Sequence, residues 1–464
     1  MVAPERSGMT QAKPGYAKVV RTCEIARTKY NMPYAWIDTC CINKSSSAEL
    51  SESINSMFRW YQDASVCLAY LSDVADTQLP FRGSRWFTRG WTLQELIAPK
   101  DVVFFDCEWG LLGTRESKAA EISTITGIPT YVLNHTYELS DIPIAQRFSW
   151  ASMRETTRAE DRAYSLLGIF DINMPMLYGE GRKAFIRLQE HILSQSDDMS
   201  LFLWNDPQTS QEYTGLLAPS PDCFREMQQV IAESRFTQRD YQLTNRGIRL
   251  KVRLAWENDT GRAILPLKHS LGPKGGWDLK SAGIYLRRVG VNLFARARPQ
   301  EFAKIETSKQ YRVFTVVRTL TQSQSATIAA TVIKISCPRE VRIVAVEPYG
   351  SFNPRAQVLH AGHTGAFLGF MMFQLGSFFS FTIVFCFRSN HWFVALVDEQ
   401  RWLSLREEFY SYYKDHLDEI DVEHTTENKE IGRITGSGPI SAVVYMRGES
   451  TPAIDIRTVA TDAH

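Results

Sequence analysis

One glutamate, Glu95, lies in a segment with two tryptophans, two leucines and one arginine, residues 86–96. If residues 91–98 are helical, Trp91 and Glu95 share a face because they are four positions apart. A carboxylate among aromatic rings and close to a cation, here Arg89, has a pKa set by those surroundings. The segment therefore offers a candidate group for acid–base or electrostatic catalysis. The alternative is a solvated glutamate on an amphipathic helix.

Short apolar runs and amphipathic stretches alternate on both sides of this segment. Apolar residues recur at helical spacing over residues 16–29, and the Ser46-x-x-Glu49 pattern predicts the start of a second amphipathic helix. Three uncharged apolar runs predict buried strands: residues 34–38, 65–71 and 101–106. Helices that alternate with such strands favour a parallel sheet with helices on both faces.

The carboxyl ends of the predicted strands hold further acidic residues. Asp38 ends the first strand and Asp73 follows the second, while Glu95 lies in the connection after it. Ligands bind beyond the carboxyl ends of parallel strands. We therefore expect Asp38, Asp73 and Glu95 to face one crevice.

Three sequence blocks resemble the fungal HET (heterokaryon incompatibility) family. The first is Tyr34-Ala-Trp-Ile-Asp-Thr-Cys-Cys-Ile-Asn-Lys, continuing to Glu52, and the second is Ser84-Arg-Trp-Phe-Thr-Arg-Gly-Trp-Thr-Leu-Gln-Glu-Leu, continuing to Pro99. The third covers residues 147–181 and is similar to the extension of HET proteins of the vegetative-incompatibility type. The resemblance covers roughly residues 15–204.

This resemblance implies a role in non-self recognition and programmed cell death when incompatible fungal cells fuse. It implies protein partners or self-assembly through the HET domain. HET domains also have a distant likeness to TIR domains, which are flavodoxin-like and in some branches cleave NAD. By that likeness, Glu95 would hold the nicotinamide ribose, and a carboxylate there would stabilise the developing positive charge. NAD is thus a candidate substrate, and no cofactor is assigned.

The candidate site follows from these two arguments. We predict Glu95 and Arg89 as the catalytic residues. The predicted binding residues are Asp38, Asp73, Trp86 and Trp91.

The N-terminus departs from the family pattern. HET domains usually begin with a strand similar to Tyr-Ala-Ile-Leu-Ser-His-Thr-Trp-Gly, whereas residues 1–14 are polar and rich in turn formers. We therefore expect a flavodoxin/TIR-like parallel sheet with flanking helices whose first strand is missing. A truncated, inactive family member is an alternative function.

Composition limits the class of protein. A length of 464 residues with 44% hydrophobic residues fits two or three globular domains. The net charge of +1 gives no bulk attraction to nucleic acid, so we expect none as a partner. The N-terminus has no apolar core of a signal peptide, and no Cys-x-x-Cys occurs, so we expect reduced thiols and a cytoplasmic protein. The pair Cys40-Cys41 is a weak redox or metal candidate, and we predict no metal site.

We predict a HET domain over residues 1–146, a helical extension over 147–204 and a β-rich domain over 205–464. In the extension, Thr157-x-x-Glu160 predicts a helix start, and Tyr178-Gly-Glu-Gly181 predicts a turn rather than a phosphate cradle before a helix over 182–193.

The rest of the chain has many short alternating segments separated by turn residues. A short helix is predicted over 223–232, and this part otherwise favours a mainly antiparallel β domain. The predicted strands are Tyr241–Leu243, Ile248–Leu254, Ala263–Leu267, Ala282–Arg287, Leu293–Ala297, Ala326–Ile335, Val341–Val346 and Trp392–Val397. Residues 366–387 carry no charge and are long enough to span a bilayer, but their polar residues and Gly376-Ser377 favour a strand meander, so no membrane is expected. His360 and His363 are interpreted as loop residues.

Overall fold

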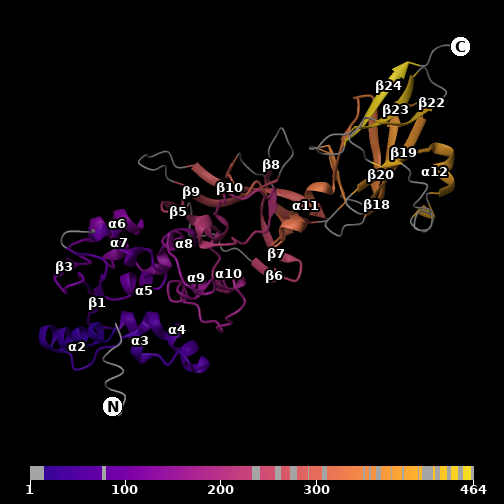
Figure 1. Ribbon diagram of the computed structural model, residues 1–464. Coiled ribbons are helices and arrows are strands. Elements are labelled where there is room, and N and C mark those ends of the chain that lie inside the picture. The colour runs from indigo at the N-terminus through magenta and orange to yellow at the C-terminus, as the bar shows by residue number, and fades with distance from the viewer. Residues whose placement is uncertain are drawn as a thin grey trace. The chain divides into compact units, whose positions relative to one another are not determined.

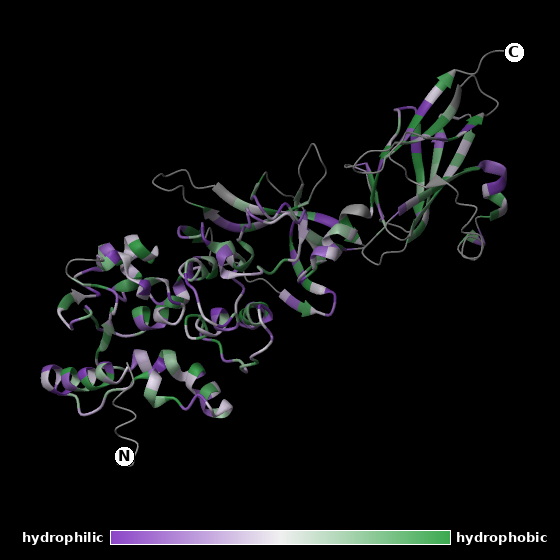
Figure 2. Cartoon of the chain, viewed as in Figure 1, coloured by the Kyte–Doolittle hydropathy of each residue, from purple (hydrophilic) through white to green (hydrophobic). Residues whose placement is uncertain are grey.

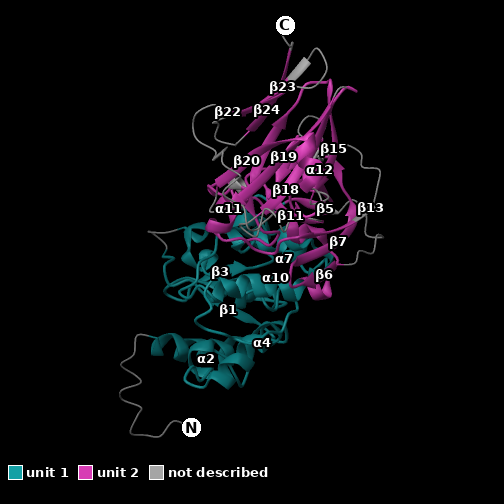
Figure 3. Cartoon of the chain, turned by 90° about the vertical axis from the view of Figure 1, so that its right-hand side faces the viewer, with its two compact units in different colours: residues 1–192, 219–228 teal, residues 193–218, 229–464 magenta. Residues whose placement is uncertain are grey.

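The structure is a computed structural model, and its elements are labelled along the chain in Figure 1. It forms two compact units, coloured in Figure 3. Unit 1 comprises residues 1–192 and 219–228, and unit 2 comprises residues 193–218 and 229–464. The residues described are 15–75, 80–232, 241–256, 263–271, 280–290, 292–305, 311–347, 351–354, 357–361, 367–377, 379–388, 391–405, 407–409, 422–423, 429–435, 440–447 and 453–460.

A small mixed sheet lies in unit 1. Its strands β1 (Cys67–Tyr70) and β2 (Val102–Phe105) run parallel, with Cys67 opposite Val102 and Tyr70 opposite Phe105. Helix α5 (Thr92–Ile97) lies in the connection between them. The third strand, β3 (Leu111–Thr114), pairs antiparallel with β2. The two strands predicted around Val66 and Val102 are therefore confirmed as a parallel pair.

The strand predicted over residues 34–38 is wrong. This segment pairs with no strand among the described residues, and Tyr34 is 91% exposed. The Trp36 ring instead packs edge-on against Trp60 and Tyr61, with centroids 5.3 and 5.6 Å apart. An uncharged apolar run has the same pattern whether it forms a buried strand or an exposed aromatic segment. The described part of unit 1 thus shows one parallel strand pair, not a larger parallel sheet.

Two amphipathic helices come before the sheet. Helix α2 (Tyr16–Tyr30) buries Ile25, which packs with Val103 and Phe105 of β2. Hydrophobic and hydrophilic residues alternate along α2 and α4 in Figure 2. The side chain of Ser46 caps α4 (Ser47–Gln62) by accepting from the Glu49 N–H at 3.3 Å. The Glu49 carboxylate accepts from the Asn43 N–H instead of completing the capping box.

The other helices of unit 1 are short, except for α10. They are α3 (Asp38–Cys41), η2 (Phe81–Gly83), η3 (Arg85–Thr88), α6 (Ala119–Thr126), α7 (Thr130–Leu133), η4 (Leu139–Asp141), α8 (Ile144–Ser149), α9 (Asp161–Tyr164), α10 (Lys183–Gln195) and η6 (Pro221–Phe224). Helix α10 extends past the end of unit 1, and it confirms the helix predicted over 182–193.

The capping box predicted at Thr157 is wrong. Helix α9 is a single turn that begins at Asp161. The Glu160 carboxylate accepts from the Gly179 and Gly181 N–H groups at 2.8 and 3.0 Å. Both glycines have positive φ, 102° and 59°, which glycine adopts at little cost. The glycine turn therefore binds a carboxylate of its own chain.

Unit 2 begins with a ten-stranded sheet whose main order is β5-β9-β10-β11-β13-β7-β6. The helix predicted over 223–232 is wrong, because its first residues belong to η6 and its last form strand β5. The strands predicted over Tyr241–Leu243 and Ile248–Leu254 are confirmed as β6 and β7, which pair antiparallel. The strands of this sheet are β4 (Tyr213–Thr214), β5 (Val230–Ala232), β6 (Tyr241–Thr244), β7 (Gly247–Arg253), β8 (Ala255–Trp256), β9 (Ala263–Leu271), β10 (Lys280–Gly290), β11 (Leu293–Ala297), β12 (Ala303–Lys304) and β13 (Tyr311–Val316).

Two further sheets share one apolar core. One has the order β16-β17-β14-β24-β23-β22 and the other β15-β18-β19-β20-β21. Hydrophobic residues dominate many of these strands in Figure 2. Their bounds are β14 (Val332–Ser336), β15 (Val341–Glu347), β16 (Phe352–Asn353), β17 (Val358–His360), β18 (Phe367–Leu375), β19 (Phe379–Arg388), β20 (His391–Asp398), β21 (Val422–Glu423), β22 (Lys429–Thr435), β23 (Ile440–Arg447) and β24 (Ala453–Ala460). Unit 2 also contains η5 (Met199–Phe202), α11 (Gln322–Ala330) and α12 (Glu399–Leu405).

Two predictions for this part have clear outcomes. The strand predicted over 326–335 is wrong in its first half, because α11 ends at Ala330 before β14 starts. The meander over 366–387 is confirmed, since β18 and β19 pair antiparallel with Leu375 opposite Phe379. Among the described residues, no helix is long and apolar enough to cross a membrane. The turns predicted at 257–261 and 272–276, His363 and residues 1–14 lie outside the described residues.

Candidate functional site

Glu95 projects from the half-buried side of α5. Its neighbours Leu93 and Leu96 are fully buried and fix the helix against the core of unit 1, while Glu95 keeps part of its surface exposed. Burial is the main cause that raises the pKa of the Glu95 carboxyl, and the Asp38 carboxylate adds to it. Lys18, a hydrogen bond from the Trp86 side chain and Arg89 act in the opposite direction. The net effect is a raised pKa.

Two aromatic side chains hold the carboxyl of Glu95. A side-chain hydrogen bond joins it to the Tyr61 hydroxyl, whose pKa is raised by burial and by the charge of Glu95. Trp86 is 7% exposed and packs edge-on against Phe104 of β2, which fixes the indole ring. Tyr61 comes from α4 and Trp86 from η3, so two elements separate in sequence converge on this carboxyl.

Arg154 packs against the segment that leads into α5. Its side chain is 3% exposed and donates to the Trp150 carbonyl at 3.1 Å, the Arg89 carbonyl at 2.9 Å and the Thr92 hydroxyl at 3.0 Å. Burial lowers the pKa of Arg154 to about 9, and the charge of Glu95 opposes this shift. Its Nη2 atom is buried and has no hydrogen-bond partner among the described residues.

The third sequence block is bonded directly to the segment that carries Glu95. The Gly90 N–H donates to the Glu155 carbonyl at 2.8 Å, and the Glu155 N–H donates to the Thr88 carbonyl at 2.6 Å. A Cβ on residue 90 would lie 2.4 Å from Cγ2 of Thr156, so only glycine fits there without a shift. The Gln94 amide also donates to the Ser165 carbonyl at 3.0 Å. The second and third blocks thus form one structural piece.

Two of the predicted binding residues point elsewhere. Asp73 accepts from the Ser84 hydroxyl and the Arg85 N–H, both at 2.8 Å, and so holds the turn before η3. Burial acts to raise the pKa of Asp73, but these hydrogen bonds outweigh it and the pKa is lowered. The Trp91 indole donates to Asp161 at 3.4 Å, on the third block. Trp86 thus bonds to the Glu95 carboxyl and the charges of Asp38 and Arg89 act on its pKa, whereas the hydrogen bonds of Asp73 and Trp91 are with other residues.

Sequence reasoning missed Tyr61, Lys18 and Arg154 as neighbours of Glu95. Tyr61 lies on the amphipathic helix predicted after Ser46, and this helix, α4, contacts α5. Arg154 carried no sequence signal beyond its place in the third block, because its partners are backbone carbonyls and one hydroxyl.

The cluster has defined chemical capacities. A carboxyl with a raised pKa can exchange a proton, and its ionised form can stabilise positive charge on a neighbouring group. The thiols of Cys40 and Cys41 are exposed, free and 4.0 Å apart. The described part of the chain contains no group of three or more residues that could hold a metal ion.

Comparison with known proteins places the chain in a class. Residues 15–85 match the family described as heterokaryon incompatibility protein (HET). Residues 15–85 thus resemble a HET domain, and they contain the first of the three sequence blocks. Over 198 residues it is 46% identical to the vegetative incompatibility protein HET-E-1 of Podospora anserina. That match covers 40% of this chain and 14% of the relative's length. Both findings support a fungal HET-domain protein. No solved structure matches the chain.

Proposed function

We propose that this chain acts in fungal vegetative incompatibility, as a HET-domain module in non-self recognition that triggers regulated cell death. The 46% identity with a vegetative incompatibility protein is the observation that carries this proposal. The hydrogen bonds between the second and third blocks support it, because they join these two HET-like blocks into one folded piece.

The remaining parts of the proposal follow from that role. The module works in the cytoplasm through protein partners or self-assembly, and not through nucleic acid. Residues 1–146 form the HET domain, residues 147–204 its extension, and residues 205–464 a β-rich domain with a sensing or regulatory role.

A fusion assay tests this function. One strain of a filamentous fungus expresses the full chain, and a second strain differs at the incompatibility loci of the host. If the chain signals incompatibility, fusion cells that contain it should die at a higher rate than fusion cells of the same strains without it. Equal survival of fusion cells over a series of partner strains and expression levels would contradict the proposal.

NAD cleavage is a second candidate, favoured by the surroundings of Glu95. Its half-buried carboxyl lies between Tyr61 and Trp86, on a helix that connects two parallel strands, as a TIR-like site would require. In this reaction the bond between the nicotinamide nitrogen and the ribose carbon breaks, and its electron pair leaves with nicotinamide. The Glu95 carboxylate stabilises the ribosyl cation until a water molecule adds its oxygen there and releases a proton.

Nicotinamide release from NAD by the purified full chain tests the second candidate. We expect Glu95→Gln to reduce the rate on the order of a hundredfold, because the charge that stabilises the cation is lost. The exposed Glu52 on α4 offers a control, and Glu52→Gln should leave the rate unchanged. No nicotinamide release at protein concentrations that permit self-assembly would remove this candidate and leave the signalling role intact.

A further inference from the structure

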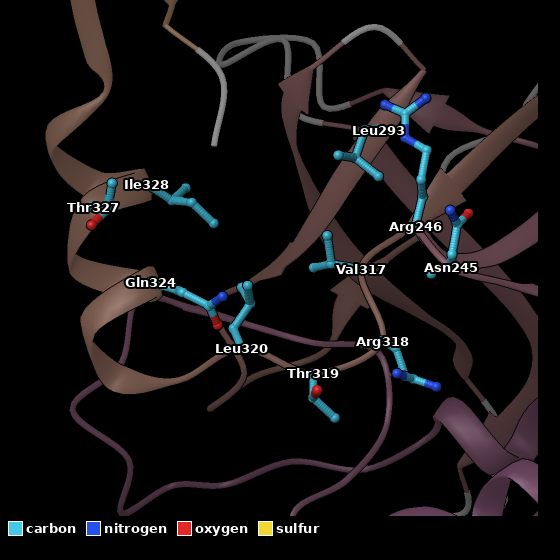
Figure 4. A pocket seen from close by; sticks show the side chains of 11 residues that line it. Asn245, Arg246, Leu293, Val317, Arg318, Thr319, Leu320, Gln324, Thr327 and Ile328 are labelled. Atoms are coloured by element: carbon cyan, nitrogen blue, oxygen red, sulfur yellow. The ribbon is translucent and has the colours of Figure 1, made fainter. Parts of the chain in front are cut away.

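Unit 2 contains a cavity of about 330 Å³, shown in Figure 4. Its walls come from the β6–β7 turn, β11, the segment that follows β13 and helix α11. The volume falls at the lower end of the range of small-molecule sites, about 300–1,000 Å³. A ligand of this cavity is therefore small.

One side of the cavity is apolar. Leu293, Val317 and Ile328 line it and are only 1%, 9% and 2% exposed. They belong to the core cluster that packs α11 against β11, and Leu320 packs against the same cluster. These residues are held by the core, so they present a fixed apolar surface to a ligand.

The charged side chains that line the cavity are positive. Its charged lining residues are Arg246 and Arg318, and no Asp or Glu lines it among the described residues. Arg246 is exposed and forms no ion pair within the described part of the chain, and Figure 4 shows its side chain beside Leu293. A guanidinium group of this kind binds a carboxylate through charge-assisted hydrogen bonds.

Gln324 lines the cavity on the side away from Arg246, as Figure 4 shows. Its Oε1 accepts from the Thr321 N–H at 2.9 Å in the capping box of α11, which fixes the orientation of the amide. The amide NH2 group has no partner among the described residues, and Figure 4 shows this side chain directed toward Leu320.

We propose that this cavity binds a small carboxylate with an apolar body, an aryl or branched alkyl group of about six carbons. The apolar body lies against Leu293, Val317 and Ile328. The carboxylate accepts from Arg246. The site belongs to the β-rich part of the chain and is independent of Glu95 and of the function proposed for the HET domain.

The test compares 3-phenylpropanoate with its neutral amide, 3-phenylpropanamide, as probes of the purified full chain in ligand-observed NMR titrations. We expect saturable binding of the carboxylate at one site and at least tenfold weaker binding of the amide, because one charge-assisted hydrogen bond is worth about that factor. Binding of the carboxylate should weaken as salt is raised.

Two variants locate the site. Arg246→Gln should weaken 3-phenylpropanoate binding about tenfold. Its control is Arg249→Gln, which removes an exposed arginine of β7 that does not line the cavity and should leave binding unchanged. Thr327→Trp should abolish binding, because the half-buried Thr327 lines the cavity and an indole ring would fill it.

Several results would overturn the proposal. These are equal affinity for the carboxylate and the amide, equal weakening by Arg246→Gln and Arg249→Gln, or undiminished binding by Thr327→Trp with an unchanged circular dichroism spectrum. Absence of saturable binding of the carboxylate by the folded wild-type chain would also overturn it.

Discussion

The guanidinium of Arg154 donates to the Thr92 hydroxyl at 3.0 Å. The single hydrogen of the Thr92 hydroxyl is shared between the Trp86 carbonyl and the Arg89 carbonyl, the latter at 2.9 Å. The arginine of the third block therefore holds the start of α5 and, through it, the position of Glu95.

Arg154→Lys should destabilise the chain by about 2 kcal/mol or more. An ammonium group cannot reach the Trp150 carbonyl, the Arg89 carbonyl and Thr92 together, and each hydrogen bond to a charged group contributes about 1.5–3 kcal/mol. Urea unfolding followed by tryptophan fluorescence measures the change. The exposed Arg182 provides the control, since Arg182→Lys should change the free energy of unfolding by less than about 0.5 kcal/mol. Equal effects of the two variants would contradict the positioning role.

Gly90→Ala should destabilise the chain by about 1–3 kcal/mol, because its Cβ would overlap Cγ2 of Thr156. Thr156→Ser removes this methyl group and keeps the hydroxyl that donates to the Arg158 carbonyl. The double variant should therefore recover most of the loss, and a double-mutant cycle measures the coupling. Additive effects of the two changes would show that the close contact between these blocks is not the cause.

The raised pKa of Glu95 predicts how stability depends on pH. The unfolded chain releases the proton of Glu95 near pH 4.5, the ordinary pKa of a glutamate, whereas the folded chain holds it up to its own, raised pKa. Between these two pH values only the folded state is protonated at Glu95. The contribution of Glu95 to the free energy of unfolding is thus fully present below pH 4.5 and is lost as the pH rises through the folded-state pKa. The wild type should lose stability relative to Glu95→Gln by at most about 1.4 kcal/mol per pH unit there.

Urea unfolding of the wild type and Glu95→Gln at pH 4, 5, 6 and 7 measures this difference. A wild type that gains stability relative to the variant as pH rises would mean a lowered pKa, and would place Glu95 in an ion pair.

The sequence predicted those parts of the fold that depend on patterns of neighbouring residues. The parallel pair of β1 and β2 followed from two buried apolar runs, and the β18–β19 hairpin from Gly376-Ser377 between β-prone residues. The prediction for residues 34–38 was wrong because their exposure depends on which elements lie beside them. The strand predicted over 326–335 ignored Thr321-x-x-Gln324, a capping box that marks the start of α11.

The candidate site was predictable only in part for the same reason. Glu95 stood out by its aromatic surroundings, and Trp86 and Arg89 are its neighbours in sequence. Arg154 lies 59 positions further along the chain, and its contacts are with carbonyls and a hydroxyl that no side-chain pattern reveals. Trp91 lies four positions before Glu95 and Asp73 lies 22 positions before it, but Asp73 bonds to Ser84 and Arg85, and Trp91 bonds to Asp161 of the third block.

Survival of fungal cells after induced expression of the full chain tests the central claim most directly. The account predicts that the wild type and Glu52→Gln reduce the surviving fraction to the same extent. It predicts that Arg154→Met, which removes the donor to the Thr92 hydroxyl and one of the two donors to the Arg89 carbonyl, restores survival at equal protein levels. Full survival of cells that express the folded wild-type chain in the presence of an incompatible partner, or equal killing by Arg154→Met, would contradict it.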